Sequence, residues 1–380
     1  MGRPSLSEDL LIEAVESYAQ HGTYAKASAA LGIQQVTLQA RVKKAIDRGY
    51  SPKHGMDNIT AEGFSVIGTS TLYDKSTGEA KIQWVKTTRD REQRELAMQA
   101  AILAMSDDIP RVDPIISPTE SNSDLLTLYP VGDHHMGMLA WGEETGGDNY
   151  DTKISEALLC SAMDYLVDTA PCSEQAAILV LGDFLHFEGH KPVTSHSGNI
   201  LDADSRYQAV VRAGLRSIKY IVRAALEKHQ EVRLILETGN HDRGPMAAFM
   251  EMFYMYYENE PRVIPDRTPR NIHIFKFGKN LVATHHGDKI KMDKLPLIIA
   301  TDWPKLWGDT EYRTVHTGHV HHDHIKEHPG ITTESHGILA PKDEYAASGG
   351  WRAKQSMKSI VLHKEYGEVG RNMVTPNMLK

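Results

Sequence analysis

Five short apolar runs, each ending in a cluster of Gly, Asp, Asn or His, constrain the fold of this chain more than any other feature. The runs have the length of strands, and stretches with helical periodicity separate several of them, at residues 152–168, 205–229 and 246–259. This alternation predicts an α/β fold with polar side chains gathered where strands end. The runs and their clusters are Leu125–Val131 before Gly132-Asp133-His134-His135, Ala176–Leu181 before Gly182-Asp183, Val232–Leu236 before Gly239-Asn240-His241-Asp242, Leu281–Ala283 before His285-His286-Gly287, and Arg313–Val315 before Gly318-His319-Val320-His321.

These clusters carry the side chains that bind metals. Histidine is abundant, with 20 in 380 residues, and neutral imidazole is the commonest metal ligand in proteins. Asp133 and His135 are two apart, so we expect both side chains on the same side of a strand end. Such a pair is common by chance, but the whole set supplies a pair of mixed nitrogen and oxygen sites. The candidate ligands are Asp133, His135, Asp183, Asn240, His286, His319 and His321.

The five clusters resemble the motif blocks of the calcineurin-like metallophosphoesterase superfamily, which read D-x-H, G-D-x-x-[D/H], G-N-H-[D/E], H-G and G-H-x-H. Every block is present and in order, over about residues 125–362. The resemblance implies an α/β fold, a two-sheet α/β/β/α sandwich, preceded here by a small helix-turn-helix domain and a β-hairpin/helix segment. It also implies two divalent metal ions, first of all Mn2+, with Mg2+, Fe2+, Zn2+ and Ni2+ as alternatives.

The resemblance assigns a role to each residue. His241 would stabilise the transition state or protonate the leaving oxygen, oriented by Asp242, and His186 of the second block would lie near the site. Two ions roughly 3.5–4 Å apart supply an activated water for in-line attack on phosphorus. No phosphate-binding GxxxxGK[ST] loop, GxGxxG turn or GxSxG elbow offers another chemistry. By the resemblance, Asp133, His135 and His321 hold the first ion, Asn240, His286 and His319 hold the second, and Asp183 bridges them.

Residues 5–50 are predicted to form three short helices, with Gly32 at the turn of a helix-turn-helix. Residues 26–53 hold six basic residues against one acidic residue, in a chain of formal net charge -8, so any contact with nucleic acid must be regional. The helices and the Gly2-Arg3-Pro4 arm resemble invertase and resolvase DNA-binding domains. A bundle that only packs, or that binds protein, is the alternative. The candidate DNA-binding residues are Arg3, Gln34, Gln35, Thr37, Gln39, Arg41, Lys43 and Lys44.

The segment between these parts divides into a hairpin, a helix and a linker. β-rich runs at 64–73 and 80–87 predict a hairpin, and 89–105 has helical character. Residues rich in Pro, Ser and Asp then predict an exposed linker. The expected domains are a helix-turn-helix at 1–54, the hairpin and helix at 60–106, the linker at 107–124 and the catalytic domain at 125–370.

The expected location is cytoplasmic. No signal peptide or membrane span is apparent, and the two cysteines, Cys160 and Cys172, are too few for a disulfide framework. A homodimer is a further expectation, because a single helix-turn-helix binds DNA weakly.

The function expected from these features is a metal-dependent DNA nuclease, acting as endonuclease or exonuclease and targeted by its first domain. The G-D-x-x-H and G-N-H-D blocks resemble the SbcD-type nuclease branch, but no capping domain or ATPase-binding segment is recognisable after His321, so a partner ATPase is not assumed. One alternative is a phosphatase or small-nucleotide phosphodiesterase whose first domain binds protein. Another is a non-catalytic DNA-binding protein on a phosphoesterase scaffold.

Overall fold

The computed structural model describes residues 8–47, 64–73, 80–89, 115–189, 192–194 and 200–380 of the chain. It divides into two compact units, Met1–Ala104 and Met105–Lys380. All five sequence clusters fall in the second unit. No helix among the described residues is both long enough and apolar enough to cross a membrane.

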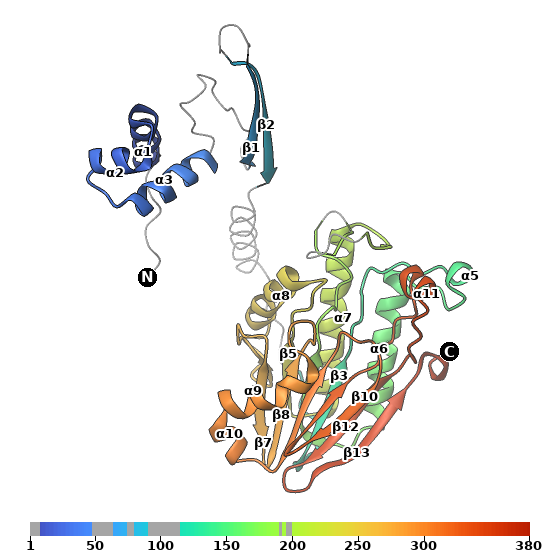
Figure 1. The fold of residues 1–380 in the computed structure, drawn as a ribbon. Helices are drawn as coiled ribbons and strands as arrows, with labels where there is room; N and C mark the ends of the chain where they lie inside the picture. The colour runs from blue at the N-terminus through green and yellow to red at the C-terminus, as the bar shows by residue number, and fades with distance from the viewer. Residues whose placement is uncertain (1–7, 48–63, 74–79, 90–114, 190–191, 195–199) are drawn as a thin grey trace. The chain divides into compact units, whose positions relative to one another are not determined.

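Among its described residues, the first unit contains three helices, α1 (Glu8–His21), α2 (Tyr24–Ala30) and α3 (Gln35–Asp47), as the periodicity predicts (Figure 1). Helices this short are marginal alone, so their packing must stabilise them. A small core of buried side chains joins them, including Leu11 from α1, Ala27 from α2 and Leu38 from α3.

A hairpin follows the three helices. Strands β1 (Phe64–Tyr73) and β2 (Ala80–Arg89) pair in antiparallel fashion, so the predicted hairpin is present and its second strand extends slightly further. The predicted helix at 89–105 lies outside the described residues except for Arg89, which ends β2. The described end of the predicted linker contains the start of the next strand, at Asn122.

The second unit contains two mixed sheets, which confirms the two-sheet α/β architecture (Figure 1). In the six-stranded sheet β3, β4, β5 and β6 run parallel, and β12 is antiparallel to both β3 and β13. In the five-stranded sheet β8, β9 and β11 run parallel, with antiparallel β7 and β10 at its edges. The strand orders are β13 (Gly367–Val374), β12 (Met357–His363), β3 (Asn122–Val131), β4 (Ser173–Val180), β5 (Glu231–Leu236), β6 (Val263–Pro265), and β10 (His324–His328), β11 (Ile331–Ser335), β9 (Tyr312–Thr317), β8 (Asn280–His285), β7 (His273–Phe277).

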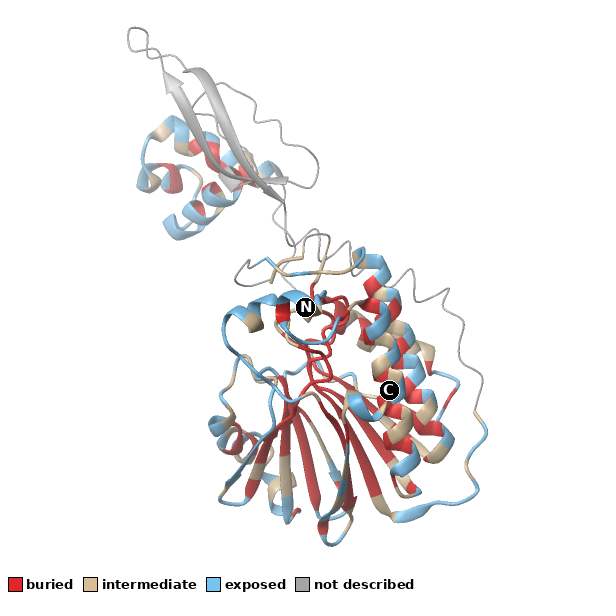
Figure 2. Ribbon diagram, turned by 90° about the vertical axis from the view of Figure 1, so that its right-hand side faces the viewer, coloured by how far each residue is buried: buried red, intermediate tan, exposed pale blue. Residues whose placement is uncertain are grey.

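Side-chain alternation along the strands builds one core on each face of the six-stranded sheet. Leu128 of β3 and Leu179 of β4 pack between the two sheets, against Val282 of β8. Their neighbours Tyr129 and Ile178 face the other way, into a larger core with three helices. Figure 2 shows the sheets as predominantly buried. The three helices of that core are α6 (Thr152–Thr169), α7 (Tyr207–Lys228) and α8 (Arg243–Tyr256).

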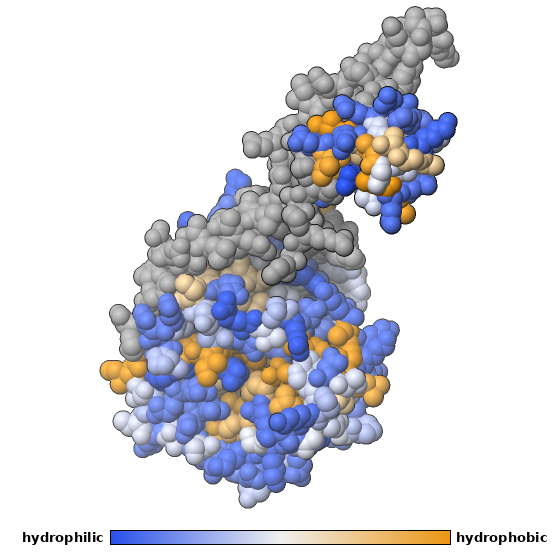
Figure 3. Space-filling view, turned by 90° about the vertical axis from the view of Figure 1, so that its left-hand side faces the viewer, coloured by the Kyte–Doolittle hydropathy of each residue, from blue (hydrophilic) through white to orange (hydrophobic). Residues whose placement is uncertain are grey.

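Helices also cover the outer face of the five-stranded sheet. Leu295 and Ile299 of α9 (Leu295–Asp302), with the partly buried Leu306 of α10 (Pro304–Gly308), pack against Leu281 and Val315 of the sheet. On the face drawn in Figure 3, apolar residues form small groups among hydrophilic ones. The unit is therefore a sandwich of two sheets with helices on both outer faces. Its parallel strands β3, β4 and β5 end in register at one edge.

Candidate metal centre

The candidate ligands all lie in loops that directly follow parallel strands. Backbone φ is positive at four of them, 50° at His135, 47° at Asp183, 70° at His319 and 59° at His321, and among the described residues Ser205 is the only other non-glycine residue of this kind. Left-handed backbone disfavours L side chains, and such strain gathers at functional sites. By strand, the ligands are Asp133 and His135 after β3, Asp183 after β4, Asn240 after β5, His286 after β8, and His319 and His321 after β9.

Asp133, His135 and His321 form the first group of donor atoms, which lie within 4.8 Å of one another. The His321 Nε2 atom lies 3.0 Å from Asp133 Oδ2 and 3.1 Å from His135 Nε2. Asp133 and His135 are buried, with 0% and 4% of their surface exposed. One carboxylate and two imidazoles from opposite sheets therefore converge on one point.

Asp183, His286 and His319 form the second group, again with donor atoms within 4.8 Å of one another. His286 Nε2 lies 3.2 Å from Asp183 Oδ2 and 3.1 Å from Asn240 Oδ1, so the amide joins this group. His286 Nδ1 lies 2.8 Å from the Leu181 carbonyl oxygen, which can only accept a hydrogen bond. The hydrogen is thereby held on Nδ1, and Nε2 is left to bind a metal ion.

Backbone contacts join the two groups. The His319 N–H donates to both oxygens of Asp133, at 2.8 and 2.9 Å, although the two residues lie in different groups. The His241 N–H donates to Asp183 Oδ1 at 2.8 Å. Two buried carboxylates, an amide and four imidazoles are the donor set that divalent transition metals prefer, and the residues therefore fit a pair of such ions.

Glycines beside the ligands permit this close approach. A Cβ at Gly239 would collide with the Asp183 carboxylate and its backbone nitrogen, and would lie 2.7 Å from its Cγ. A Cβ at Gly318 would collide with Asp133 Oδ1. Glycine is therefore required before Asn240 and before His319, because in each case a carboxylate from another strand occupies the place of a Cβ.

Burial and charge shift the pKa values of the ligands in different directions. Burial lowers the pKa of His135 well below its ordinary value, and the neighbouring His241 and His321 lower it further. Burial also disfavours charge on His286, but Asp183 outweighs it and raises the pKa of that imidazole to about 10. In turn, burial opposes the charge of Asp183, but His286 and His241 hold its pKa at about 2. The Asp183 carboxylate is thus ionised, and a cation bound beside it would displace the second proton of His286 from Nε2.

His241 and His186 lie against the first group. The donor atoms of His135, His186 and His241 lie within 4.8 Å of one another, and His186 Nδ1 is 3.2 Å from His135 Nδ1. His241 Nδ1 lies 2.7 Å from the His186 carbonyl oxygen, so this nitrogen carries the hydrogen. His241 Nε2 points toward the centre, 4.0 Å from Asp183 Oδ2.

Asp242 has a different role from the one expected. Its carboxylate accepts from the backbone N–H groups of Gly239 and Leu185, both at 2.9 Å, and is fully buried. The orientation of His241 comes from the carbonyl of His186. Asp242 therefore fixes two strand-end loops relative to each other, and the prediction that it orients the His241 ring is wrong.

A third group of histidine and carboxylate side chains, apart from the two ligand groups, was not predicted from the sequence. His316, Glu334 and His336 are buried with donor atoms within 4.8 Å of one another, because β9 and β11 pair in parallel. Only the register of that pairing could have revealed them. Arg371 and Lys358 already bond Glu334, at 2.9 and 3.4 Å. Because the Arg371 and Lys358 side chains neutralise the Glu334 carboxylate, this group is a buried polar network between the sheets.

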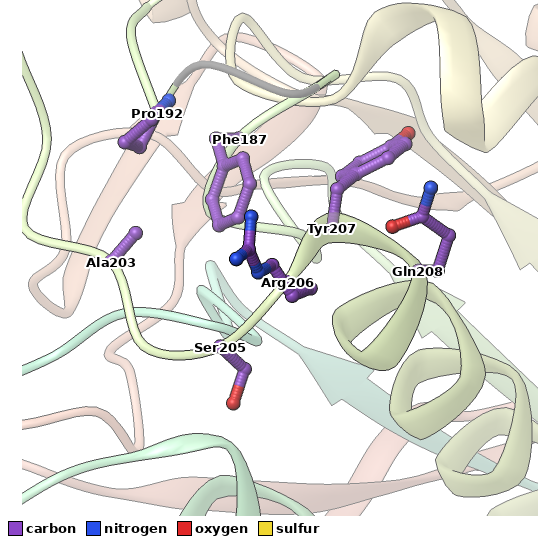
Figure 4. A pocket seen from close by; sticks show the side chains of 7 residues that line it. All are labelled: Phe187, Pro192, Ala203, Ser205, Arg206, Tyr207 and Gln208. Atoms are coloured by element: carbon purple, nitrogen blue, oxygen red, sulfur yellow. The ribbon is translucent and has the colours of Figure 1, made fainter.

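A cavity of about 520 Å³ beside the centre was also missed, because its lining comes from three separate stretches of sequence. Phe187, which follows His186, lines it with Arg206 and Tyr207. The Arg206 side chain points toward the Phe187 ring (Figure 4). Among the lining residues that the structure describes, Phe187 and Tyr207 are aromatic and Arg206 is the only cation.

The predicted DNA-binding residues of the first unit lie mostly on the solvent side of α3. Leu38 and Val42 face the small core, which leaves the polar positions outward. Arg41 is partly buried, and Arg3 lies outside the described residues. DNA contact stays a prediction. The exposed candidates are Gln34, Gln35, Thr37, Gln39, Lys43 and Lys44.

Known proteins that resemble this chain were found among solved structures. No known family and no curated protein matches the chain. Among solved structures, a conserved uncharacterized protein of Streptococcus pneumoniae TIGR4, a predicted phosphoesterase, is 10% identical with TM-score 0.27, covering 67% of this chain and 99% of its own. Vps29 of Chaetomium thermophilum is 11% identical with TM-score 0.29, covering 66% and 97%. Zinc-bound Vps29 of Entamoeba histolytica is 10% identical with TM-score 0.24, covering 65% and 98%.

Proposed function

We propose that residues 105–380 form a metal-dependent phosphoesterase that acts on phosphodiesters and uses two divalent cations. One observation supports this above all: two groups of carboxylate and imidazole donors, most of them buried, from four strand ends, lie next to each other and share backbone contacts through Asp133. A purely structural site has no physical need for so many desolvated donor atoms. Asp133, His135 and His321 would hold one ion, Asn240, His286 and His319 the other, with Asp183 between them.

The chain's own residues prepare the reaction. Bound ions would supply Lewis-acid polarisation of the phosphoryl oxygens and an activated water. The His186 carbonyl accepts a hydrogen bond from His241 Nδ1 and so turns Nε2 toward the centre. As an imidazolium, which carries a second proton on Nε2, the ring would donate that proton to a leaving oxygen. Leu181 and Asp242 fix the ligand loops, because their hydrogen bonds hold His286 and the Gly239 segment in place.

DNA is the phosphodiester we propose as substrate. The support is the basic segment around α3, whose polar side chains face solvent. Salt-dependent attraction of phosphates by such residues would deliver DNA to the second unit. A homodimer would strengthen that binding, and Mn2+ is the proposed metal. A phosphatase with a protein-binding first domain, and a DNA-binding protein without activity, are the outcomes that the test must separate.

The test is hydrolysis of bis-p-nitrophenyl phosphate and of labelled linear, circular and single-stranded DNA by the purified full chain. Mn2+, Mg2+ and EDTA are compared, with Asp183→Asn as the inactive variant and the exposed Asp309→Asn as its control. We expect metal-dependent cleavage of both substrates, lost in Asp183→Asn and retained in Asp309→Asn. Hydrolysis of the small diester without DNA cleavage would move the substrate away from DNA. No hydrolysis of either would refute the phosphoesterase.

A further inference from the structure

Three aromatic side chains, Trp141, Tyr345 and Trp351, lie exposed at the end of the second unit that carries the metal centre. Their exposed fractions are 56%, 64% and 55%. The other two tryptophans whose side chains the structure describes, Trp303 and Trp307, pack against the core beneath α9 and α10. Exposed apolar groups that gather in one place mark binding surfaces, whereas scattered ones do not. We call these three residues the aromatic platform.

Contacts with neighbouring residues hold two rings of the platform, those of Tyr345 and Trp351. The ring centroids of Tyr345 and Trp351 are 4.9 Å apart, with an angle of 43° between the rings. The Trp351 ring lies against Gly349, where a Cβ would come within 2.5 to 3.0 Å of ring atoms. The Arg352 guanidinium donates to the carbonyl oxygens of Ala346, at 3.2 Å, and of Trp351, at 2.8 Å. Side chains fixed in this way lose little conformational entropy when a ligand stacks on them.

The platform rests on segments that touch the metal ligands. Trp141 precedes the short helix α5 (Gly142–Thr145), which is adjacent to α11 (Glu344–Ser348), the helix that carries Tyr345 (Figure 1). Beneath them, a small core packs Met138 against Ile338. The Met138 N–H donates to the carbonyl of His135 at 2.9 Å.

A second contact ties the platform to Asp133. The glycine before that ligand, Gly132, lies so close to Gly337 that a Cβ would collide with the Gly337 carbonyl oxygen. One of the two segments beneath the platform therefore continues from the loop that holds Asp133 and His135, and the other packs against Gly132 of that loop.

The charges around the platform are mixed. Lys342 lies beside the loop that ends α5, with its Cε 3.3 Å from the position of a Cβ on Gly147. Arg352 and Lys354 follow Trp351 in sequence. Acidic residues lie on the same two helices, Glu143 and Glu144 on α5 and Glu344 on α11, with Asp343 directly before it. The platform would therefore contribute stacking, and the metal centre would attract the phosphate. A ligand that spans both would combine flat apolar groups with phosphates. Unpaired nucleobases joined by phosphodiesters have this chemistry, and each base stacked on an aromatic ring contributes about 1–3 kcal/mol.

We propose that the aromatic platform stacks an unpaired nucleobase next to the phosphodiester held in the metal centre, so that the substrate class is single-stranded nucleic acid. This inference rests on the proposed function. It goes beyond it, because it names a recognition surface in the second unit that is independent of the basic helix α3.

Short substrates separate the platform from the first unit. Cleavage by the full chain with Mn2+ is measured on a labelled single-stranded oligonucleotide of about four nucleotides and on the same oligonucleotide carrying abasic sites. The variants are Trp351→Ala and Tyr345→Ala. The control is Tyr366→Ala, because Tyr366 is 69% exposed but lies in the turn between β12 and β13, away from the carboxyl ends of the parallel strands.

The expected result is a rise of about tenfold in KM for the base-bearing oligonucleotide in Trp351→Ala, the value for one lost stacking contact. The preference over the abasic oligonucleotide should disappear in the same variant, while the KM for the abasic oligonucleotide stays unchanged. Retention of that preference would overturn the proposal. So would an equal loss on both oligonucleotides, because the rings would then support the metal centre itself.

The same loss of preference should appear in binding alone. Affinity for both oligonucleotides is measured by fluorescence anisotropy in the Asp183→Asn background, with and without Trp351→Ala. This readout does not need catalysis, so it holds even if no phosphodiester is cleaved. Base-dependent affinity that Trp351→Ala removes supports the platform, and equal affinity with and without Trp351 contradicts it.

Discussion

Substitution of Gly239 by alanine should remove metal binding without unfolding the protein. The new Cβ would lie 2.7 Å from Asp183 Cγ and still closer to the carboxylate and the backbone nitrogen. An ordinary carbon–carbon contact is about 3.5 Å, so the carboxyl carbon must retreat by about 0.8 Å. Metal–ligand distances tolerate about 0.2 Å, so this displacement is several times too large. We expect metal affinity to fall by at least 10–100-fold, and overpacking to cost about 1–3 kcal/mol in the free energy of unfolding.

The assay for Gly239→Ala combines isothermal titration with Mn2+ and thermal unfolding of the metal-free protein. Gly308→Ala is the matched control, because a Cβ at Gly308 would meet nothing within 4 Å. Wild-type metal affinity in a folded Gly239→Ala protein would show that the Gly239 loop does not need to lie against Asp183, and would refute the reasoning.

Three further predictions concern single side chains. His241→Ala should lower kcat for bis-p-nitrophenyl phosphate by about 10²–10⁴-fold while metal content stays unchanged, and a loss of metal instead would make His241 a ligand. Burial lowers the pKa of His229 to about 4, against 6.5 when exposed, so the unfolded chain binds this proton first and stability is lost as pH falls from 6.5 toward 4. The loss in the free energy of unfolding is roughly 3 kcal/mol. His229→Gln should be less stable at pH 7, because Tyr129 loses its partner at 2.8 Å. Its free energy of unfolding, measured in urea, should however depend less on pH than that of the wild type. An unchanged profile would contradict the burial argument. Lys43→Ala and Lys44→Ala should each weaken DNA binding and reduce the slope of log affinity against log salt by about one, with hydrolysis of the small diester unaffected; an unchanged slope would exclude α3 from the phosphate contact.

The sequence predicted the five strands that precede the ligand clusters, β3, β4, β5, β8 and β9, because each of them ends in a polar loop. The helix expected at 152–168 is observed as Thr152–Thr169, and the one at 246–259 as Arg243–Tyr256, which starts directly after the Asn240-His241-Asp242 turn. The ligand segments after β3, β4, β5, β8 and β9 come together, since these strands run parallel within their sheets.

The local reason for one ligand position was different from the predicted one. Strand alternation was expected to place Asp133 and His135 on one side, but β3 ends at Val131 and His135 has φ of 50°. The turn, and not the pleat, therefore directs its ring. The intervening His134 does point away, into a hydrogen bond of 2.9 Å with Ser155.

Contacts between elements that are far apart in the sequence could not be predicted from the sequence. The buried network of His316 and Glu334 depends on the register of β9 and β11, and the aromatic platform depends on the adjacency of α5 and α11. Neither follows from periodicity, because pairing partners and loop packing are tertiary properties. The hydrogen bond between His241 and the carbonyl of His186 could not be predicted either, since every residue carries the same backbone carbonyl.

The central claim is that this chain binds two catalytic divalent cations, and the most direct measurement is metal stoichiometry by mass spectrometry after loading with Mn2+ and removal of free ions. The account predicts two ions per wild-type chain, fewer in Asp183→Asn, and hydrolysis of bis-p-nitrophenyl phosphate that rises with the second ion. A folded wild-type chain that retains no ion, or that hydrolyses the diester equally well in EDTA, would contradict it.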